Sequence, residues 1–267
     1  MKFLLFDILL YFFGIITYGG SAAVSFSFAN FFWSENYLVN TLIISLSFLL
    51  FLHTFILILG LLKKIFQPKL IVGDFPISLN KDYFAWGLNS VFCGLFFSSP
   101  FTEISQLLFS TNWLFYRSMG MKRPFSTLIG QKTIIRQPEL ITLGSHSIIG
   151  LGAVLTCHFS PNTKTHTQQR ITVGNHCVVG GAANIAPGVT ISDRSVIGSK
   201  SSLFPSVVIG SGVRMGAFCR VDSGVTIPDN VRIKSHSRVT RDLKITSGDI
   251  LEGSPAKVIK KGDHNEV

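Results

Sequence analysis

Residues 173–196 read VGNHCVVGGAANIAPGVTISDRSV, and an aliphatic residue opens every group of six. The same six-residue period continues without a break through IGSKSS, LFPSVV, IGSGVR, MGAFCR, VDSGVT, IPDNVR, IKSHSR and VTRDLK, which ends at residue 244. The first position is always aliphatic or methionine, and the fifth is Val, Ser, Ala or Cys in all groups but one. A repeat of constant short period over so many units predicts a solenoid.

A period of six excludes an α-helix, whose side chains recur every 3.6 residues, and a simple strand, whose side chains alternate. It is typical of a short strand followed by a turn, with the aliphatic first residue in the core and a small residue easing the turn. Coils of this kind pair their backbones with the coils above and below, so the ends need caps. An earlier part of the six-residue repeat begins near Ile129. The repeat is regular again from Leu143 to the interruption after His158. We expect the caps before Ile129 and after Leu243.

This repeat resembles that of the hexapeptide-repeat acyltransferases, whose members form a left-handed parallel β-helix with three hexapeptides per turn. VGNHCVVGGAANIAPGVTI is similar to the family core I-G-x-x-x-x-I-G-x-x-A-x-I-x-P-G-V-x-I, and LEGSPAKVIKK, at residues 251–261, is similar to the family ending G-x-P-A-K-V-I-K. The resemblance covers about half of the chain. It implies an all-β left-handed parallel β-helix over residues 127–245, followed by a C-terminal cap and tail over residues 246–267. It also implies acetyl-CoA or another acyl-CoA as co-substrate, and a homotrimer whose clefts lie between subunits.

The first half of the chain is much more apolar than the second. Residues 3–29 and 39–62 form two runs of the length that crosses a hydrocarbon core as a helix, about 20 residues. Only 14% of the chain is charged, whereas about a quarter is usual in a soluble domain. We therefore expect an N-terminal α-helical membrane anchor, a two-helix transmembrane hairpin over residues 1–66. A cleaved signal peptide does not fit, because a second run follows and no small-x-small site precedes a polar start.

The lysines orient this hairpin. Residues 30–38, between the two runs, contain no Lys or Arg, whereas Lys63, Lys64 and Lys69 follow the second run and Lys2 precedes the first. By the positive-inside rule both ends of the hairpin face the cytoplasm. The expected location is the inner (cytoplasmic) membrane, with a multi-pass anchor and the β-helix on the cytoplasmic side.

A third, weaker apolar segment spans residues 83–109, where Pro100 and several polar residues interrupt it. We interpret it as part of an interfacial helical linker over residues 67–126; a third membrane span would instead place the β-helix outside the cell. The phrases GDFPIS, YFAWGL and NWLFYRSMGMKRP ahead of PELITLGSHSIIG are similar to the membrane-anchored hexapeptide modules at the C-terminus of polylysine-synthetase-type peptide synthetases.

The net charge and the cysteine content indicate which binding partners and cofactors to expect. The net charge is +10, and we assign the excess to anionic membrane lipid and to a phosphorylated ligand. No basic stripe with interleaved aromatic residues is present, so nucleic acid is not an expected partner. The cysteines are Cys93, Cys157, Cys177 and Cys219, which form no CxxC pair. No metal site is expected, and reduced thiols fit the cytoplasm.

The interruption FSPNTKTHTQQR, residues 159–170, directly follows His158. In the galactoside, maltose and related sugar O-acetyltransferases of the family, a histidine, a polar excursion and an I-x-I-G coil follow in the same order. The resemblance implies that His158 is the general base. An imidazole suits this role, because its pKa near the working pH lets it take the proton of a hydroxyl as the oxygen attacks a thioester. The alternative is a loop that protrudes without catalytic purpose.

The remaining candidate residues are contacts to coenzyme A and to the acceptor. The resemblance implies coenzyme A contacts at Gly181 and Ser199, and location suggests basic contacts to its phosphates. Within the excursion, His166 and Arg170 are candidate substrate contacts, together with Thr163 and Lys164. The basic candidates for the phosphates are Lys200, Arg241 and Lys260.

Other histidines and the neighbouring cysteine have simpler interpretations. His146, His176 and His236 occupy the fourth position of their hexapeptides, which predicts solvated turn residues. Cys157 is interpreted as a small residue of the solenoid rather than a nucleophile, because the family reaction needs no covalent intermediate.

Together these features predict a membrane-anchored acyltransferase that moves an acyl group, with acetyl preferred, to a glycan or lipid-linked cell-surface precursor. The anchor favours that acceptor class because it holds the cleft near the bilayer. Two alternatives stay open. One is a peptide-bond-forming module that acts on a carrier-bound aminoacyl group, and the other is a non-catalytic trimeric scaffold.

Overall fold

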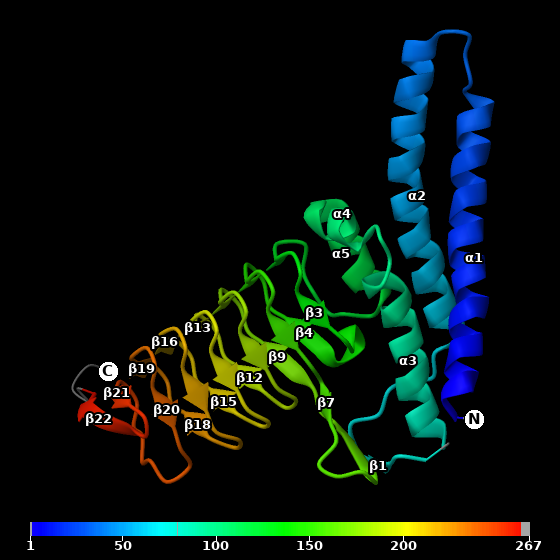
Figure 1. The fold of residues 1–267 in the computed structure, drawn as a ribbon. Helices are drawn as coiled ribbons and strands as arrows, with labels where there is room; N and C mark the ends of the chain where they lie inside the picture. Colours follow the sequence, from blue (N-terminus) through cyan, green and yellow to red (C-terminus); the bar gives the residue numbers. More distant parts are fainter. Residues whose placement is uncertain (1, 79, 263–267) are drawn as a thin grey trace. The chain divides into compact units, whose positions relative to one another are not determined.

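The computed structural model describes residues 2–78 and 80–262 (Figure 1). The chain separates into two compact units. The first comprises Met1–Leu70 and Leu79–Gly120, and the second comprises Ile71–Ser78 and Met121–Val267. The short segment Ile71–Ser78 therefore leaves the first unit to become part of the second.

The first unit is helical. Its helices are α1 (Lys2–Phe31), α2 (Tyr37–Phe66), α3 (Lys81–Phe97), α4 (Thr102–Leu107) and α5 (Phe109–Ser118). The side chains of Asn36 and Asn80 accept hydrogen bonds from the first backbone N–H groups of α2 and α3, as N-cap residues do. The fully buried rings of Phe96 and Phe115 stack and join α3 to α5.

Among the described residues, Leu4–Phe31 and Tyr37–Phe66 are the helices long and apolar enough to cross a membrane. They contain the two apolar runs expected from the sequence. A break at residues 98–101 separates α3 from α4, and Pro100 lies in it. Lys63 is buried within this unit, where its Nζ lies 2.9 Å from Asn89 Oδ1 and 3.1 Å from the Met119 carbonyl oxygen. This lysine is held by protein dipoles, which the charge pattern did not predict.

The second unit is a parallel β-solenoid with three sheets along its length (Figure 1). The first sheet contains β4 (Ile141–Leu143), β9 (Ile171–Val173), β12 (Thr190–Ile191), β15 (Val208–Ile209) and β18 (Thr226–Ile227). The second contains β2 (Leu128–Ile129), β5 (Ile148–Ile149), β10 (Val178–Val179), β13 (Val196–Ile197), β16 (Arg214–Met215), β19 (Arg232–Ile233), β21 (Ile250–Gly253) and β22 (Ala256–Lys260). The third contains β3 (Ile134–Ile135), β6 (Val154–Leu155), β11 (Asn184–Ile185), β14 (Ser202–Leu203), β17 (Arg220–Val221) and β20 (Arg238–Val239).

The repeat explains this architecture residue by residue. Every first-position side chain from Val173 to Val239 is buried, and so are the fifth-position side chains from Cys177 to Ser237. Most fourth-position residues have positive φ, in the left-handed region, including His146, His176 and His236. The predicted fold class is thus confirmed: two apolar helices precede a solenoid that matches the hexapeptide-repeat left-handed β-helix.

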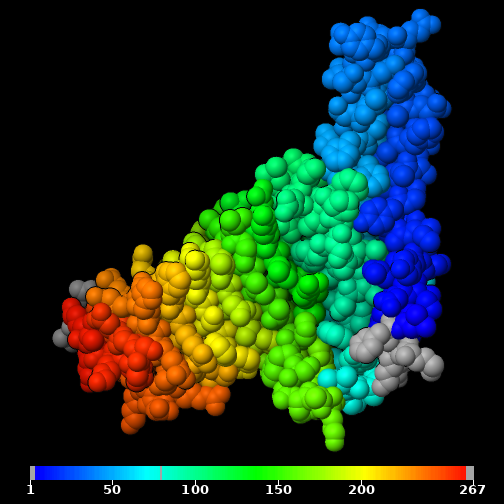
Figure 2. Space-filling model, in the orientation of Figure 1, coloured from blue at the N-terminus to red at the C-terminus, as the bar shows by residue number. Residues whose placement is uncertain are grey.

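Each end of the solenoid carries an additional backbone pairing. At the N-terminal end, Lys122 bridges to Thr142 beside β4. At the C-terminal end, β21 continues the second sheet by pairing with β19, and β22 folds back antiparallel on β21. This hairpin is the red element at the end of the stacked coils (Figure 2). The first sheet is thus extended at its N-terminal end and the second at its C-terminal end, as the capping of a solenoid requires.

Candidate active site

The candidate site lies along one edge of the solenoid, which we call the third corner: the turns that join the third sheet to the first. The regular spacing across it is six residues, as from Ile185 to Ile191, but Ile135 and Leu143 are eight residues apart. In the next coil Leu155 and Val173 are eighteen apart. The third corner therefore carries an insertion of two residues in the first coil and of twelve in the second.

The longer insertion folds as a small antiparallel sheet. β7 (His158–Phe159) pairs with β8 (Thr165–Gln168), and β8 pairs on its other side with β1 (Gly73–Pro76). The Thr167 hydroxyl donates to Asp74 Oδ1 at 2.6 Å, and the Ile77 N–H donates to the Lys164 carbonyl oxygen at 2.8 Å. The polar excursion is thus an ordered hairpin, held by a strand that precedes α3 in the chain.

His158 opens this hairpin and has defined contacts. Its Nδ1 lies 2.9 Å from Oε1 of Gln137, which belongs to the two-residue insertion. Its ring stacks on His166, with centroids 5.0 Å apart and planes 23° apart. Burial lowers the pKa of His158 below its usual 6.5, and the nearby positive charge of Arg136 lowers it further. His158 is therefore a neutral imidazole at neutral pH.

His166 lies behind His158. Only 2% of it is exposed, and Phe75 of β1 packs on its ring with centroids 5.0 Å apart. Its Nδ1 is 3.2 Å from the Ser160 hydroxyl oxygen. Burial lowers its pKa to about 4, and His158 adds to the effect. His166 is thus a packing partner of His158 in this structure.

A groove of about 270 Å³ begins at His158 and follows the third corner. Small or flat side chains from successive coils line it, among them Asn184, Ala186 and Ser202. Asn184 and Ser202 are adjacent in register on β11 and β14, so they repeat at the spacing of the coils. Phe204 lies at its far end.

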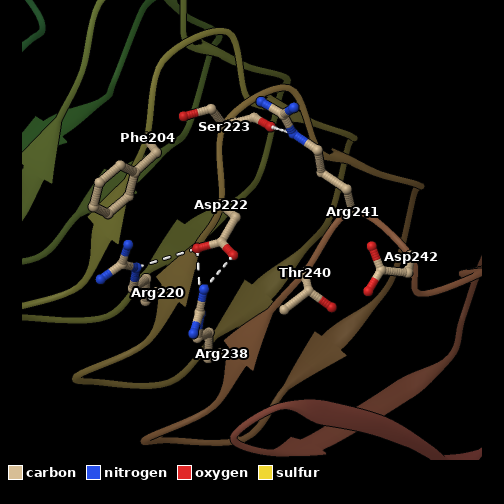
Figure 3. A pocket seen from close by; sticks show the side chains of 8 residues that line it. All are labelled: Phe204, Arg220, Asp222, Ser223, Arg238, Thr240, Arg241 and Asp242. Carbon is tan, nitrogen blue, oxygen red and sulfur yellow. Dashed lines mark hydrogen bonds and ion pairs between the residues drawn. The ribbon is translucent and has the colours of Figure 1, made fainter.

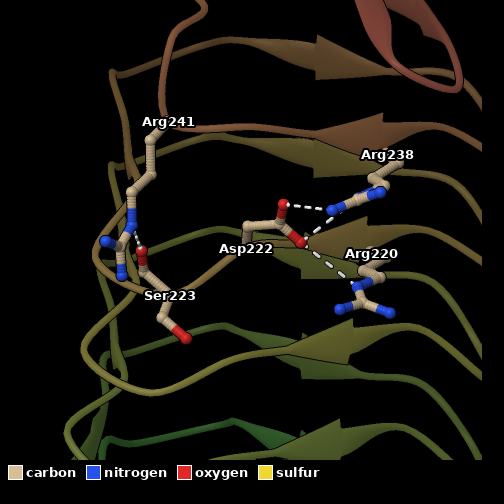
Figure 4. A network of polar contacts seen from close by, with 5 residues as sticks. All are labelled: Arg220, Asp222, Ser223, Arg238 and Arg241. Atoms are coloured by element: carbon tan, nitrogen blue, oxygen red, sulfur yellow. Dashed lines mark hydrogen bonds and ion pairs between the residues drawn. The ribbon is translucent and has the colours of Figure 1, made fainter.

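Phe204 also lines a second cavity of about 430 Å³, further along the same corner (Figure 3). There Asp222 accepts from Arg220 at 3.1 Å and from Arg238 at 2.8 Å (Figure 4). The Arg220 guanidinium lies 4.3 Å from the centre of the Phe204 ring. Hydrogen bonding from Arg238 holds the pKa of Asp222 below its usual range. The two cavities have Phe204 in common, and their lining residues follow the corner from His158 to the arginines.

Arg241 completes the second cavity. Its Nε donates to the Ser223 carbonyl oxygen (Figure 4). The cavity lining contains three arginines, Arg220, Arg238 and Arg241, and two acidic residues, Asp222 and Asp242. It therefore presents a net positive charge with several guanidinium N–H donors, the chemistry that suits phosphate.

The structure brings some of the predicted residues together and separates others. His158 and His166 meet in the hairpin, and Arg241 lies on the same corner. Arg170 is exposed at the end of the excursion, as are Thr163 and Lys164 at its turn. The remaining coenzyme A candidates lie elsewhere on this chain: Gly181, Ser199 and Lys200 at the turns between the second and third sheets, and Lys260 on β22.

The thiols and the turn histidines have no part in this geometry. Cys157 is fully buried, and burial raises the pKa of its thiol to about 12. The four cysteines are free and buried. Over residues 2–78 and 80–262, no group of three or more His, Cys, Asp or Glu side chains is placed to hold a metal ion.

The sequence analysis missed Gln137, Arg220, Asp222 and Arg238. Two signals were present. First, the repeat lengthens from six to eight residues between Ile135 and Leu143. Second, Arg220 and Arg238 occupy the sixth position of hexapeptides that are eighteen residues apart. In a solenoid that spacing places the two arginines on adjacent strands of one sheet.

Of the comparisons with known proteins, only the one with solved structures found matches. No family model matches the chain, and no curated protein matches it. Among solved structures, PerB from Caulobacter crescentus in complex with CoA and GDP-perosamine has 18% identity and a TM-score of 0.38, over 57% of this chain and 65% of PerB. A maltose O-acetyltransferase from Clostridium difficile has 19% identity and a TM-score of 0.37, over 67% and 89%. A hexapeptide transferase family protein from Anaplasma phagocytophilum has 17% identity and a TM-score of 0.40, over 52% and 80%.

Proposed function

We propose that this protein is an acyl-CoA-dependent acyltransferase, with acetyl the preferred group, and that His158 is its general base. The observation that carries the proposal is the third corner itself. A half-buried histidine lies at one end of a groove lined by small side chains, and three arginines line the adjoining cavity further along the corner. A thioester bound through its phosphates in the cluster would extend along the groove toward His158.

The chemistry assigned to His158 is direct transfer. Its unprotonated ring nitrogen takes the proton of the acceptor hydroxyl or amine while the acceptor atom attacks the thioester carbonyl carbon. A bond from that carbon to the acceptor forms, and the carbon–sulfur bond breaks. The imidazolium then returns the proton to the leaving thiolate, so the products are acylated acceptor and free coenzyme A. A neutral histidine can start this cycle at neutral pH, and the lowered pKa of His158 supports that state.

The acceptor we propose is a glycan or lipid-linked cell-surface precursor. Two apolar helices support a membrane anchor, because most of their large apolar side chains are exposed in the described chain. An anchor at the cytoplasmic face would concentrate the enzyme where lipid-linked acceptors lie. A homotrimer, as the sequence resemblance implies, would place a neighbouring subunit beside the third corner.

The first experiment tests turnover. The full-length protein in detergent, supplied with acetyl-CoA and a panel of sugar acceptors, should release free thiol. His158→Ala should lower kcat by about 10²- to 10⁴-fold, the usual contribution of a general base. The matched control is His176→Ala, because His176 occupies the same hexapeptide position at an uninterrupted turn, and it should keep the wild-type rate. A wild-type protein that neither binds nor turns over acetyl-CoA would favour the scaffold alternative and reject the proposal.

A second variant pair tests the arginine cluster. Arg220→Gln combined with Arg238→Gln removes charge-assisted hydrogen bonds and should raise KM for acetyl-CoA about tenfold or more. The matched control is Arg214→Gln combined with Arg232→Gln. These arginines are paired in register in the same two coils, but on the second sheet. An equal rise in KM for both pairs would mean that general surface charge, and not this cavity, holds the phosphates.

A further inference from the structure

Gln137 lies where the two insertions of the third corner meet. It belongs to the two-residue insertion of the first coil, directly before Pro138 and the short 3₁₀ helix Pro138–Leu140. It is fully buried, and its carbonyl oxygen accepts from the Leu140 N–H at 3.0 Å. The following proline restricts its backbone. The side chain therefore leaves a rigid part of the corner.

The Gln137 amide has its orientation fixed by a backbone group. Its Oε1 accepts from the Cys157 N–H at 3.2 Å, and the same oxygen lies 2.9 Å from His158 Nδ1. A backbone N–H can only donate, so the atom that faces Cys157 must be the oxygen of the amide rather than its nitrogen. An amide oxygen can only accept, and so Nδ1 of His158 must carry the hydrogen.

We infer that Gln137 is a positioning residue that holds neutral His158 as its Nδ1–H tautomer and leaves the ring lone pair on Nε2. This tautomer is a property of the resting protein. Its use in catalysis rests on the proposed function, in which Nε2 takes the acceptor proton. Other histidines at proton-transfer and metal sites are likewise oriented by the hydrogen bond of the second nitrogen.

An amide suits this position better than a carboxylate would. When Nε2 takes a proton, the Nδ1–H···Oε1 bond becomes charge-assisted and strengthens. Gln137 carries no charge, so it does not add the full electrostatic attraction for the imidazolium that a carboxylate at this position would add. Two titratable groups face His158. The positive charge of Arg136 opposes its protonation, and His166 packs on its ring. The base is thus kept neutral before the reaction and oriented throughout.

The direct test reads the tautomer without any turnover. In full-length protein labelled with ¹⁵N-histidine, the His158 signals should show hydrogen on Nδ1 and a lone pair on Nε2 at neutral pH. Signals assigned by comparison with His158→Gln should change to a mixture of tautomers in Gln137→Leu. The matched control is Gln131→Leu, at the same hexapeptide position of the preceding turn, and it should change nothing. Hydrogen on Nε2 in the wild type would overturn the inference.

Kinetics then separate positioning from a general structural effect. Gln137→Leu should lower kcat about 10- to 100-fold, as loss of an orienting partner does, with KM for acetyl-CoA unchanged. Gln137→Glu keeps both acceptor contacts, so it should fold even if the leucine variant does not. Its negative charge should move the acidic limb of the pH–rate profile upward in pH. Equal kcat in all three proteins would overturn the inference.

The two readouts also distinguish this inference from the proposed function. If the ¹⁵N signals show the Nδ1–H tautomer but His158→Ala retains full activity, Gln137 orients a histidine that is not the base, and the proposed function fails alone. If His158→Ala is inactive but the wild type carries hydrogen on Nε2, the base assignment stands and the inference about Gln137 fails.

Discussion

His158 and His176 occupy the same position of the hexapeptide, and each ring stacks on another histidine, yet their backbone conformation, burial and hydrogen bonding differ. His176 is exposed at a regular turn, with φ of 55° and a ring that stacks on His146 of the adjacent coil. His158 begins a strand instead of a turn, is half-buried, and is bonded to Gln137. The repeat supplies a histidine at both places. Only at His158 do two insertions add burial and an orienting partner, the longer one following His158 and the shorter one carrying Gln137.

The difference teaches how a solenoid acquires a site. Within an unbroken coil the fourth residue must adopt the left-handed turn, which directs its side chain to solvent. Twelve inserted residues remove that constraint, because the chain leaves the coil before the turn is made. Two further residues in the coil below provide the space for Gln137. The candidate site lies where two consecutive coils depart from the period at the same corner.

Deleting residues 159–170 should have the largest effect, because it should make the surroundings of His158 like those of His176. Because the insertion is two hexapeptides long, the deletion joins His158 to Ile171 and restores an unbroken beat, LTCHIT, before Val173. We expect the solenoid to fold and His158 to adopt a left-handed turn. Acyl transfer should then fall by at least about 10²-fold, the contribution of a general base. The pKa of His158 should rise toward its usual 6.5, because burial is lost.

The measurements are circular dichroism for the fold, thiol release for activity and NMR titration for the histidine. A deletion variant that keeps the wild-type rate would show that the hexapeptide position alone suffices, and the contrast between His158 and His176 would then have no functional meaning.

Phe75→Ala should loosen the hairpin while leaving the coils intact. Phe75 is 4% exposed and packs on His166 across the β1–β8 pair. Removing a buried phenylalanine ring costs about 3–5 kcal/mol. That loss should appear as easier opening of β8, measured by amide hydrogen exchange. Phe125→Ala is the control because Phe125 is 65% exposed, and its effect on β8 should be within about 0.5 kcal/mol. Unchanged exchange in Phe75→Ala would mean that β1 does not support the hairpin.

The solenoid could be predicted from the sequence because its physics is local and repeated. Each aliphatic first residue pairs with the residue at the same position of the next coil, as Ile185 pairs with Leu203. The period of the sequence therefore also predicts which residues are in contact. His158 could be chosen from the sequence as a candidate for the related reason that it adjoins the largest departure from that period. The helices α1 and α2 followed from the length of their apolar runs.

The rest depended on contacts that no period encodes. β1 lies more than eighty residues before its partner β8, and nothing in GDFP indicates pairing with THTQ. Phe75 of that distant strand packs on the buried ring of His166, and the polar excursion, for which no strands were predicted, is an ordered sheet. Gln137 was hidden for a different reason: a shift of two residues is small beside one of twelve, and the two act together only in three dimensions.

The burial of His166 makes the smallest and most specific prediction, a dependence of stability on pH. Its pKa falls from 6.5 in the unfolded chain to about 4 in the folded protein. Between these values the unfolded chain binds a proton that the folded protein does not, so stability is fully present above pH 6.5 and declines as pH falls toward 4. His166→Gln should flatten the part of the curve between pH 6.5 and 4, as measured by denaturant unfolding at pH 7.0, 5.5 and 4.5. Parallel curves for variant and wild type would mean that His166 titrates freely, and the hairpin would then not be the closed structure that distinguishes His158 from His176.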